Sequence, residues 1–183
     1  EGEFPNDDGS VDQFNDDGSS VTTDAEGNQN YYNDDGSGGT ISSDGSSESW
    51  DSEGNYSYEG ADGSSSETNV DGSSSYEDSQ GNSGWDDGQG NGGYTGADGS
   101  WGEYNADGTS SWGDEQGSGG WSDADGSSGW YDAEGNGGGY SSDGSSWSNS
   151  ADGSGSYNGA DGSTNEWNSD GSGSYNYPDG TSG

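Results

Sequence analysis

The side chains of this sequence that could do chemistry are carboxylates, and they recur beside glycines at a fixed spacing. The chain has 183 residues, with 38 Asp and Glu and no Lys, Arg or His. Glycine stands at every ninth position from Gly9 to Gly180, and the residue before each of these glycines is Asp, Glu or Gln. Carboxylate and carbonyl oxygens are the hard ligands that Ca²⁺ accepts in flexible geometry. The spacing therefore predicts calcium at the Asp-Gly turns.

The amount of negative charge agrees with one divalent cation per repeat. Thirty-eight carboxylates over twenty repeats are almost two per repeat, so one such ion in each repeat would nearly cancel the charge. Mg²⁺ suits these turns less well because it holds its water more tightly. The alternative is an edge of solvated Asp side chains that keeps the chain soluble, with diffuse counter-ions. The candidate calcium ligands are Asp7, Asp8, Asp16, Asp17, Asp34, Asp35, Asp123, Asp125, Asp132 and Glu134.

The nine-residue period, the Gly-Asp turn and the acidic composition extend over the whole chain. In these features the sequence resembles the calcium-binding nonapeptide repeats of the RTX β-roll family. The unit of that family is G-G-x-G-x-D-x-U-x with a large aliphatic residue at U, whereas this chain has one fixed glycine per turn and no recurring aliphatic residue. The family completes a coil in two nonapeptides. The resemblance implies calcium dependence and secretion.

The residue types exclude most catalytic sites and several classes of partner. Without His, Cys, Lys or Arg, neither a Ser-His-Asp nor a Cys-His site nor a phosphate clamp can form. Paired carboxylates can hydrolyse glycosides, but twenty nearly equivalent copies do not make a unique site, so we expect no catalytic residue and no enzyme. Nucleic acids and anionic membranes need basic groups on the protein, so we expect neither as a partner.

The elements that must position these carboxylates are short strands. Asp-Gly and Glu-Gly-Asn sequences favour turns, because Gly accepts positive φ and Asp and Asn bond to nearby backbone groups. About four or five residues then remain for an extended segment, and these are Gly, Ser, Thr and aromatic residues rather than helix formers. The spacing has no insertion, so we expect one repeat array over residues 1–183. Because the chain begins at Glu1 without Met, we expect it to be a processed product or a segment of a longer protein.

A second period, of three repeats, overlies the first and predicts how the repeats stack. In most blocks of three repeats, the third glycine is followed by Asn, and an aromatic residue of the first repeat recurs at the same spacing. We therefore predict an all-β repeat fold, a three-sided β-solenoid with about 27 residues per coil and coils about 4.8 Å apart. The residues expected to form stacked ladders are Asn28, Asn55, Asn82 and Asn136 at a corner, and Phe4, Tyr31, Tyr58, Trp85 and Trp112 on a face.

Two alternatives to the solenoid follow from the same composition. Gly90, Gly93, Gly96 and Gly99 have a local period of three, which is compatible with a polyproline-II or extended glycine-rich fibre. A hydrophobic fraction of 19% with a net charge of −38 is typical of a disordered acidic polymer. The unbroken phase of the repeats favours an ordered structure over disorder.

The aromatic residues are the large apolar groups that remain to hold such a structure together. Eight Trp, twelve Tyr and two Phe would make contacts between neighbouring rods or form platforms for sugar rings. We therefore expect an extracellular structural protein, part of a fibre, sheath, surface layer or adhesin stalk, that self-associates into filaments or sheets and is stabilised by divalent cations. Carbohydrate is a further expected partner. The alternatives are an ice- or mineral-binding protein and a disordered acidic matrix polymer.

Overall fold

The computed structural model describes residues 2–183, and all of its regular elements are strands of four residues. The chain divides into two compact units, one of residues 1–92 and one of residues 93–183. The strands of the first unit are β1 (Gly2–Pro5), β2 (Val11–Phe14), β3 (Ser20–Thr23), β4 (Gln29–Tyr32), β5 (Gly38–Ile41), β6 (Ser47–Trp50), β7 (Tyr56–Glu59), β8 (Ser65–Thr68), β9 (Ser74–Glu77) and β10 (Ser83–Asp86). Strand β11 (Gly92–Thr95) lies across the division.

The second unit repeats the same element. Its strands are β12 (Trp101–Tyr104), β13 (Ser110–Gly113), β14 (Gly119–Ser122), β15 (Ser128–Tyr131), β16 (Gly137–Tyr140), β17 (Ser146–Asn149), β18 (Gly155–Asn158), β19 (Thr164–Trp167) and β20 (Gly173–Asn176). No helix occurs in residues 2–183, and so none in that range is long and apolar enough to cross a membrane.

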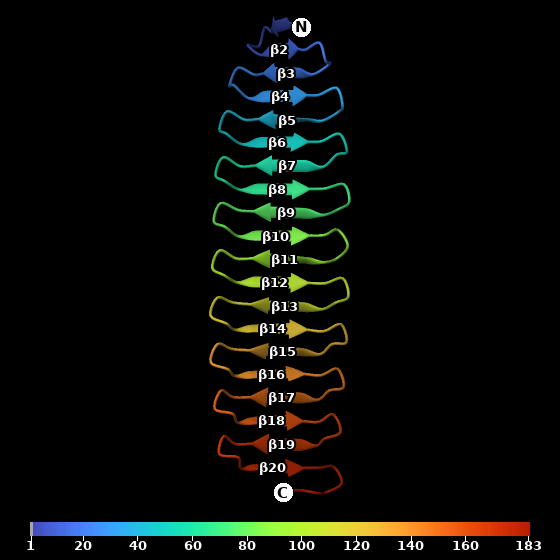
Figure 1. Cartoon of the computed structure of the whole chain (residues 1–183), viewed down its shortest axis with the longest axis vertical. Coiled ribbons are helices and arrows are strands. Elements are labelled where there is room, and N and C mark those ends of the chain that lie inside the picture. The colour runs from blue at the N-terminus through green and yellow to red at the C-terminus, as the bar shows by residue number, and fades with distance from the viewer. Residues whose placement is uncertain (1) are drawn as a thin grey trace. The chain divides into compact units, whose positions relative to one another are not determined.

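Each unit is an antiparallel meander in which a strand pairs with the next strand of the chain (Figure 1). The first residue of one strand faces the fourth residue of the next, as for Ser110 and Ser122, and the fourth faces the first, as for Gly113 and Gly119. Successive strands begin nine residues apart, so four strand residues alternate with five turn residues. The turns consequently alternate between the two edges of each meander, and repeats that run in the same direction are two repeats apart.

The turn between β14 and β15 shows why glycine recurs. The Asp123 N–H donates to the Ser127 carbonyl over 2.8 Å, and the Gly126 N–H donates to the Asp123 carbonyl over 3.0 Å. These two bonds close a three-residue hairpin loop, a type I turn followed by a residue with positive φ. Gly126 has φ of 91°. A side chain is strained in this conformation, so each hairpin needs a glycine at the same place.

We predict that Gly126→Ala lowers the free energy of unfolding by about 1–2 kcal/mol, the cost of forcing an L-residue into left-handed backbone. No atom lies within 4 Å of the position of the new Cβ, so the effect isolates backbone strain from steric overlap. Urea unfolding followed by circular dichroism measures it. Gly126→Asn should cost less, because Asn tolerates positive φ better than Ala. Equal stability of wild type and Gly126→Ala would contradict the assigned turn.

The all-β prediction is confirmed, but the registers differ from the predicted three-sided solenoid. A solenoid needs parallel strands stacked once per coil, whereas here the five-residue turns reverse the chain after every strand. The bonds between adjacent strands also differ from a polyproline-II fibre, which has no such ladder. The physical reason is the hairpin loop, because its two hydrogen bonds bring consecutive strands side by side instead of turning the chain by a third of a circle.

The meanders have no apolar core. None of the large apolar side chains in residues 2–183 is buried: most are exposed, with a fraction of 67% at Tyr140, and the others, such as Trp50 and Trp167, are half-buried. The buried residues of the strands include many glycines, for example Gly138 and Gly139 of β16. Strand backbones and the rings that cover them therefore supply the packing that a second layer supplies in an ordinary β-domain.

Candidate functional site

The register of the second unit gathers aromatic rings on one face. Residues paired across two antiparallel strands lie on the same face, and the faces alternate along each strand. Following the pairs from β12 to β20 assigns every strand residue to a face. We call one of them the aromatic face of the second unit; its aromatic residues are Trp101, Trp121, Tyr131, Trp147, Tyr157, Trp167 and Tyr175.

The tryptophans of this face lie over glycines of the adjacent strands. Trp121 is paired with Gly129, and a Cβ added to Gly129 would be 2.8 Å from the Trp121 ring. Trp147 covers Gly139 in the same way, with 2.9 Å to Nε1. The exposed fractions of Trp121 and Trp147 are 38% and 37%. Each ring is therefore covered on one side by backbone and is open to a ligand on the other side.

The first unit has a comparable face, on which neighbouring rings touch. Phe4 and Phe14 make an edge contact with 5.9 Å between ring centroids, and Tyr32 and Trp50 are 5.8 Å apart. The Trp50 Nε1–H donates to the Gly36 carbonyl over 3.2 Å, which fixes that ring. The aromatic residues on this face are Phe4, Phe14, Tyr32, Trp50, Tyr56, Tyr58 and Tyr76.

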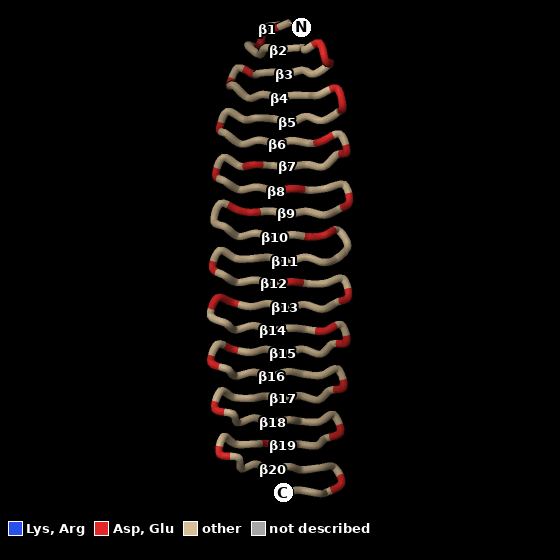
Figure 2. Tube along the Cα trace, in the orientation of Figure 1, with Lys and Arg blue, Asp and Glu red and all other residues tan. Residues whose placement is uncertain are grey.

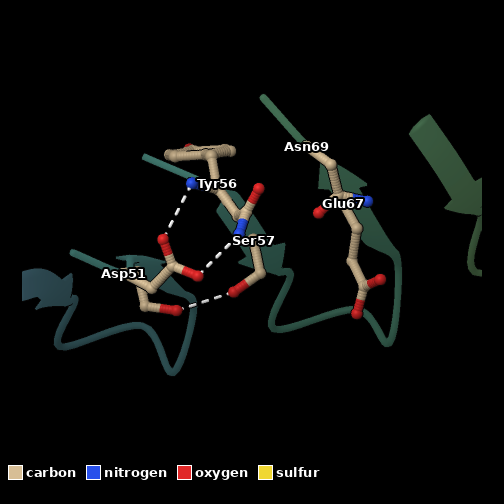
Figure 3. Close-up of a pocket in the computed structure, with 7 residues that line it drawn as sticks. Asp51, Tyr56, Ser57, Glu67 and Asn69 are labelled. Carbon is tan, nitrogen blue, oxygen red and sulfur yellow. Dashed lines mark hydrogen bonds between the residues drawn. The ribbon is translucent and has the colours of Figure 1, made fainter. Parts of the chain in front are cut away.

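A polar hollow of about 230 Å³ lies beside the turn that joins β6 to β7 (Figure 3). The Ser49 and Ser57 hydroxyls are 2.6 Å apart there. The Asp51 carboxylate accepts the Asn55 side-chain amide over 2.7 Å, so it serves the turn. Glu67 is paired with Ser57 across the sheet. The hollow can hold water and hydrogen-bond donors. Its lining residues are Ser49, Asp51, Asn55, Tyr56, Ser57, Glu67 and Asn69.

Most turns use the Asp before the glycine as an acceptor. In the turn between β2 and β3, Asp17 Oδ1 accepts the Ser19 N–H over 3.0 Å and the Ser19 hydroxyl over 2.7 Å. These bonds, first the one from the Ser19 side chain, lower the pKa of Asp17 below its ordinary value of 3.8. The carboxylate thus replaces water as the partner of two groups that the hairpin would otherwise leave exposed.

A second class of turn places the Asp at the first turn position and Asn after the glycine. In the turn between β15 and β16, Asp132 Oδ1 accepts the Asn136 N–H, and Asp132 Oδ2 accepts Asn136 Nδ2, both over 2.7 Å. The Asn136 side chain is the main cause of the lowered pKa of Asp132. In this class the residue before the glycine is Glu or Gln, because the acceptor has moved to the start of the turn.

The predicted Asn ladder is replaced by these local pairs. Asn28, Asn55, Asn82 and Asn136 each bond to the Asp four residues earlier: Asp24, Asp51, Asp78 and Asp132. The side-chain oxygen of the Asn makes the contact between turns, because Asn28 Oδ1 accepts the Ser43 N–H over 2.8 Å. Ser43 belongs to the turn that comes two turns after that of Asn28, on the same edge of the first unit. The turns therefore contact one another, but not at the predicted spacing of three repeats.

The structure does not stack the predicted aromatic column either. Phe4, Tyr31, Tyr58 and Trp85 lie on β1, β4, β7 and β10, each three strands from the next, which is about 14 Å at the usual strand spacing. Phe4 and Tyr58 share one face of the first unit, and Tyr31 and Trp85 lie on the other. Trp112 lies in the second unit, on the face opposite its aromatic face.

The predicted calcium ligands all lie in turns but are divided between different roles. Asp8, Asp17 and Asp35 accept hydrogen bonds from the serine after the glycine, and Asp125 accepts the Ser127 N–H. Asp132 accepts those of Asn136. Asp7, Asp16 and Asp34 occupy the second turn position, Asp123 the first and Glu134 the third. In residues 2–183 no three carboxylates are gathered as a metal site. Calcium at the turns stays a prediction.

The two turn classes predict a reciprocal effect of paired substitutions. Asp132→Ser removes the acceptor of Asn136, so we expect it to lower the thermal midpoint measured by circular dichroism. Adding Glu134→Asp and Asn136→Ser converts this turn to the first class, in which the Asp before the glycine is the acceptor. The turn between β16 and β17 is an example, where Asp143 accepts hydrogen bonds from Ser145. This triple variant should recover most of the loss. If it is less stable than the single variant, the equivalence of the two classes is wrong.

No protein-family model and no curated protein sequence matches the chain. Among solved structures, it is similar to the TCP10 domain of Danio rerio CPAP in complex with a peptide of STIL, with 16% identity, 94% of this chain and 96% of that chain covered, and a TM-score of 0.54. It is also similar to the G-box domain of the microcephaly protein CPAP, with 18% identity, 88% and 99% covered, and a TM-score of 0.52. At these identities the likeness shows a shared all-β fold.

Proposed function

We propose that this chain is a non-enzymatic protein-binding scaffold that uses its exposed aromatic faces to hold segments of partner proteins. The observation that carries the proposal is the set of partly exposed tryptophan rings that lie over glycines of the adjacent strand, such as Trp121 on Gly129. Contiguous exposed apolar surface marks interaction sites, and Trp and Tyr supply much of the energy at protein interfaces. The TCP10 domain of similar fold was solved in complex with a peptide, which supports a peptide partner for this kind of sheet.

Titration with synthetic peptides tests this proposal. The full chain is mixed with a panel of extended peptides of about 12 residues with graded charge and aromatic content, and tryptophan emission is recorded. We expect saturable binding by at least one class of peptide. The binding should be lost in a variant that combines Trp121→Ser, Trp147→Ser and Trp167→Ser. A chain that binds no peptide, or a triple variant that binds as well as wild type, would exclude these rings as a protein-binding site.

A structural role is a second candidate, because the meander leaves large rings exposed with no core to bury them. Copies that associate through these faces would form filaments or sheets outside the cell, as the composition predicts. Each copy carries 38 negative charges, so close contact between copies needs counter-ions. Divalent cations such as calcium, at the turns or between copies, would supply them. Carbohydrate stacked on the rings is a further candidate partner of such a surface.

We predict that millimolar calcium raises the thermal midpoint of the chain and that a chelator reverses the increase, since cations reduce repulsion among 38 carboxylates. Circular dichroism measures the midpoint, and electron microscopy of the same samples shows whether filaments form. Sodium chloride at equal ionic strength is the control for simple screening. Filaments with calcium alone would favour the structural role. If calcium and sodium have the same effect, ordered calcium sites are excluded.

A further inference from the structure

We propose that the partner of the aromatic face of the second unit is an extended polypeptide segment rich in Arg or Lys, lying across strands β12–β20. This inference rests on the proposed function and names the chemistry of the partner. Its basis is the arrangement of the rings in two rows, the glycines beneath them and the distribution of charge around them.

The first row is defined by an unbroken series of cross-strand pairs. Trp121 faces Gly129, which faces Gly139, and Gly139 faces Trp147. The row continues from Trp147 to Tyr157, and through Asn165 to Tyr175. Four rings thus lie in one line perpendicular to the strands. A ligand that follows this line contacts successive strands rather than one loop.

The second row runs beside the first and alternates rings with glycines. In this row, Trp101 is paired with Gly113, Gly113 with Gly119, and Gly119 with Tyr131. Tyr131 leads through Gly137, Asn149 and Gly155 to Trp167. A Cβ on Gly155 would lie 2.3 Å from the Trp167 ring, so that ring also covers a glycine of the adjacent strand. The rows together present partly exposed aromatic rings, and guanidinium groups stack on such rings while ammonium groups make cation–π contacts with them.

The charges of the second unit surround this face rather than cover it. Strands β13 to β18 and β20 contain no Asp or Glu, and Glu103 is the one acid among the strand residues of the aromatic face. The other carboxylates of the unit lie in the turns, except Glu166 on the opposite face. Figure 2 shows them along both edges, with no basic residue in the chain. A basic segment on the rings therefore has acidic groups on both sides of it.

Charge complementarity distinguishes this partner from three others. A second copy of the chain has the same net charge of −38, and nucleic acid is also anionic, so both are repelled. A neutral polysaccharide would stack on the rings but would form no ion pairs with the carboxylates of the turns. A basic polypeptide can stack on the rings and form ion pairs with the carboxylates of the turns at the same time. Strands β12 and β20 are about 38 Å apart at the usual spacing, which an extended segment of about 12 residues spans.

The test uses the full chain and an alternating Arg-Gly peptide of about 12 residues, with calorimetry and tryptophan emission as readouts. We expect saturable binding that weakens by about tenfold or more when the salt rises from roughly 20 to 200 mM, because screening reduces the attraction of the edges. Trp147→Ser should weaken binding by about fivefold. Trp147→Leu keeps an apolar side chain over Gly139 but lacks the ring, so it should fold and still lose affinity.

Trp130→Ser is the matched control, since Trp130 lies in the same unit on the other face and has a comparable exposed fraction of 48%. It should leave the affinity within about twofold. An equal loss with Trp130→Ser overturns the assignment of the face. If a neutral peptide or a neutral glucan oligosaccharide binds as tightly as the Arg-Gly peptide, the proposal of a basic partner is wrong. Tight binding of the neutral peptide would still support the proposed protein-binding function. Absence of binding by every peptide overturns both proposals.

Discussion

Gly139→Ala is expected to destabilise the second unit by about 1–3 kcal/mol, the usual cost of forcing an extra carbon into filled space. The ideal Cβ at this position would lie 2.5 Å from the Ser128 carbonyl oxygen and 2.9 Å from Trp147 Nε1. The carbonyl belongs to the backbone of β15 and cannot rotate away, so the strand itself has to move. Urea unfolding followed by tryptophan emission and far-ultraviolet circular dichroism measures the change.

Ser111→Ala provides the control for Gly139→Ala. Ser111 lies on the same aromatic face and already has a Cβ, so its substitution should change the free energy of unfolding by less than about 0.5 kcal/mol. Combining Gly139→Ala with Trp147→Ala separates the two contacts. Because the clash with the Ser128 carbonyl remains, the combined variant should keep most of the loss. Wild-type stability of Gly139→Ala would show that the backbones of β15 and β16 are less closely spaced than described.

The strands and turns of this fold could be predicted because their determinants are local. A glycine with positive φ at every ninth position, such as Gly126, and an Asp or Asn that bonds within the turn set both the turn and the length of the strand. The absence of helix formers in the intervening segments decided the fold class. None of these features depends on which strand lies beside which.

The pairing of the strands could not be derived from the spacing alone. Residues at multiples of nine fit stacked coils as well as a meander, and the choice depends on whether the turn closes a hairpin. The hydrogen bonds of Gly126 and Asp123 show that it does. The rows of rings and glycines appear only after this register is known, because nothing in the sequence singles out the pair of Trp121 and Gly129.

The period of three repeats arose from turn chemistry rather than from stacking. Asn28, Asn55 and Asn82 occur at every third turn, and each belongs to the class with Asp at the first turn position. Asn91 follows in the very next turn and bonds to Asp87 in the same way, which breaks the period. In the sequence, an early Asp accompanies Glu26 or Gln89 before the glycine, and only the hydrogen bonds show that this pattern is one of two local capping arrangements.

Acidification is expected to unfold the chain, because hydrogen bonds lower the pKa of an Asp in almost every turn below the ordinary value of 3.8. The unfolded chain then takes up protons at higher pH than the folded chain. The stabilisation is therefore complete above about pH 4 and is lost as the pH falls through the lower pKa values of the folded state. Reduced repulsion among the carboxylates acts in the opposite direction, but the bonds to groups such as Asn136 and Ser145 are the larger cause of the shifts.

The measurement is the thermal midpoint by circular dichroism from pH 7 to pH 2 at constant ionic strength. We expect a nearly constant midpoint down to about pH 4 and a steep fall below it, because many equivalent turns lose their acceptor over the same range. Glu134→Gln is the control, since Asp132 rather than Glu134 accepts the bonds of Asn136, and the variant should follow the wild-type curve. A midpoint that rises steadily between pH 4 and pH 2 would mean that charge repulsion, and not turn hydrogen bonding, governs the stability of this acidic sheet.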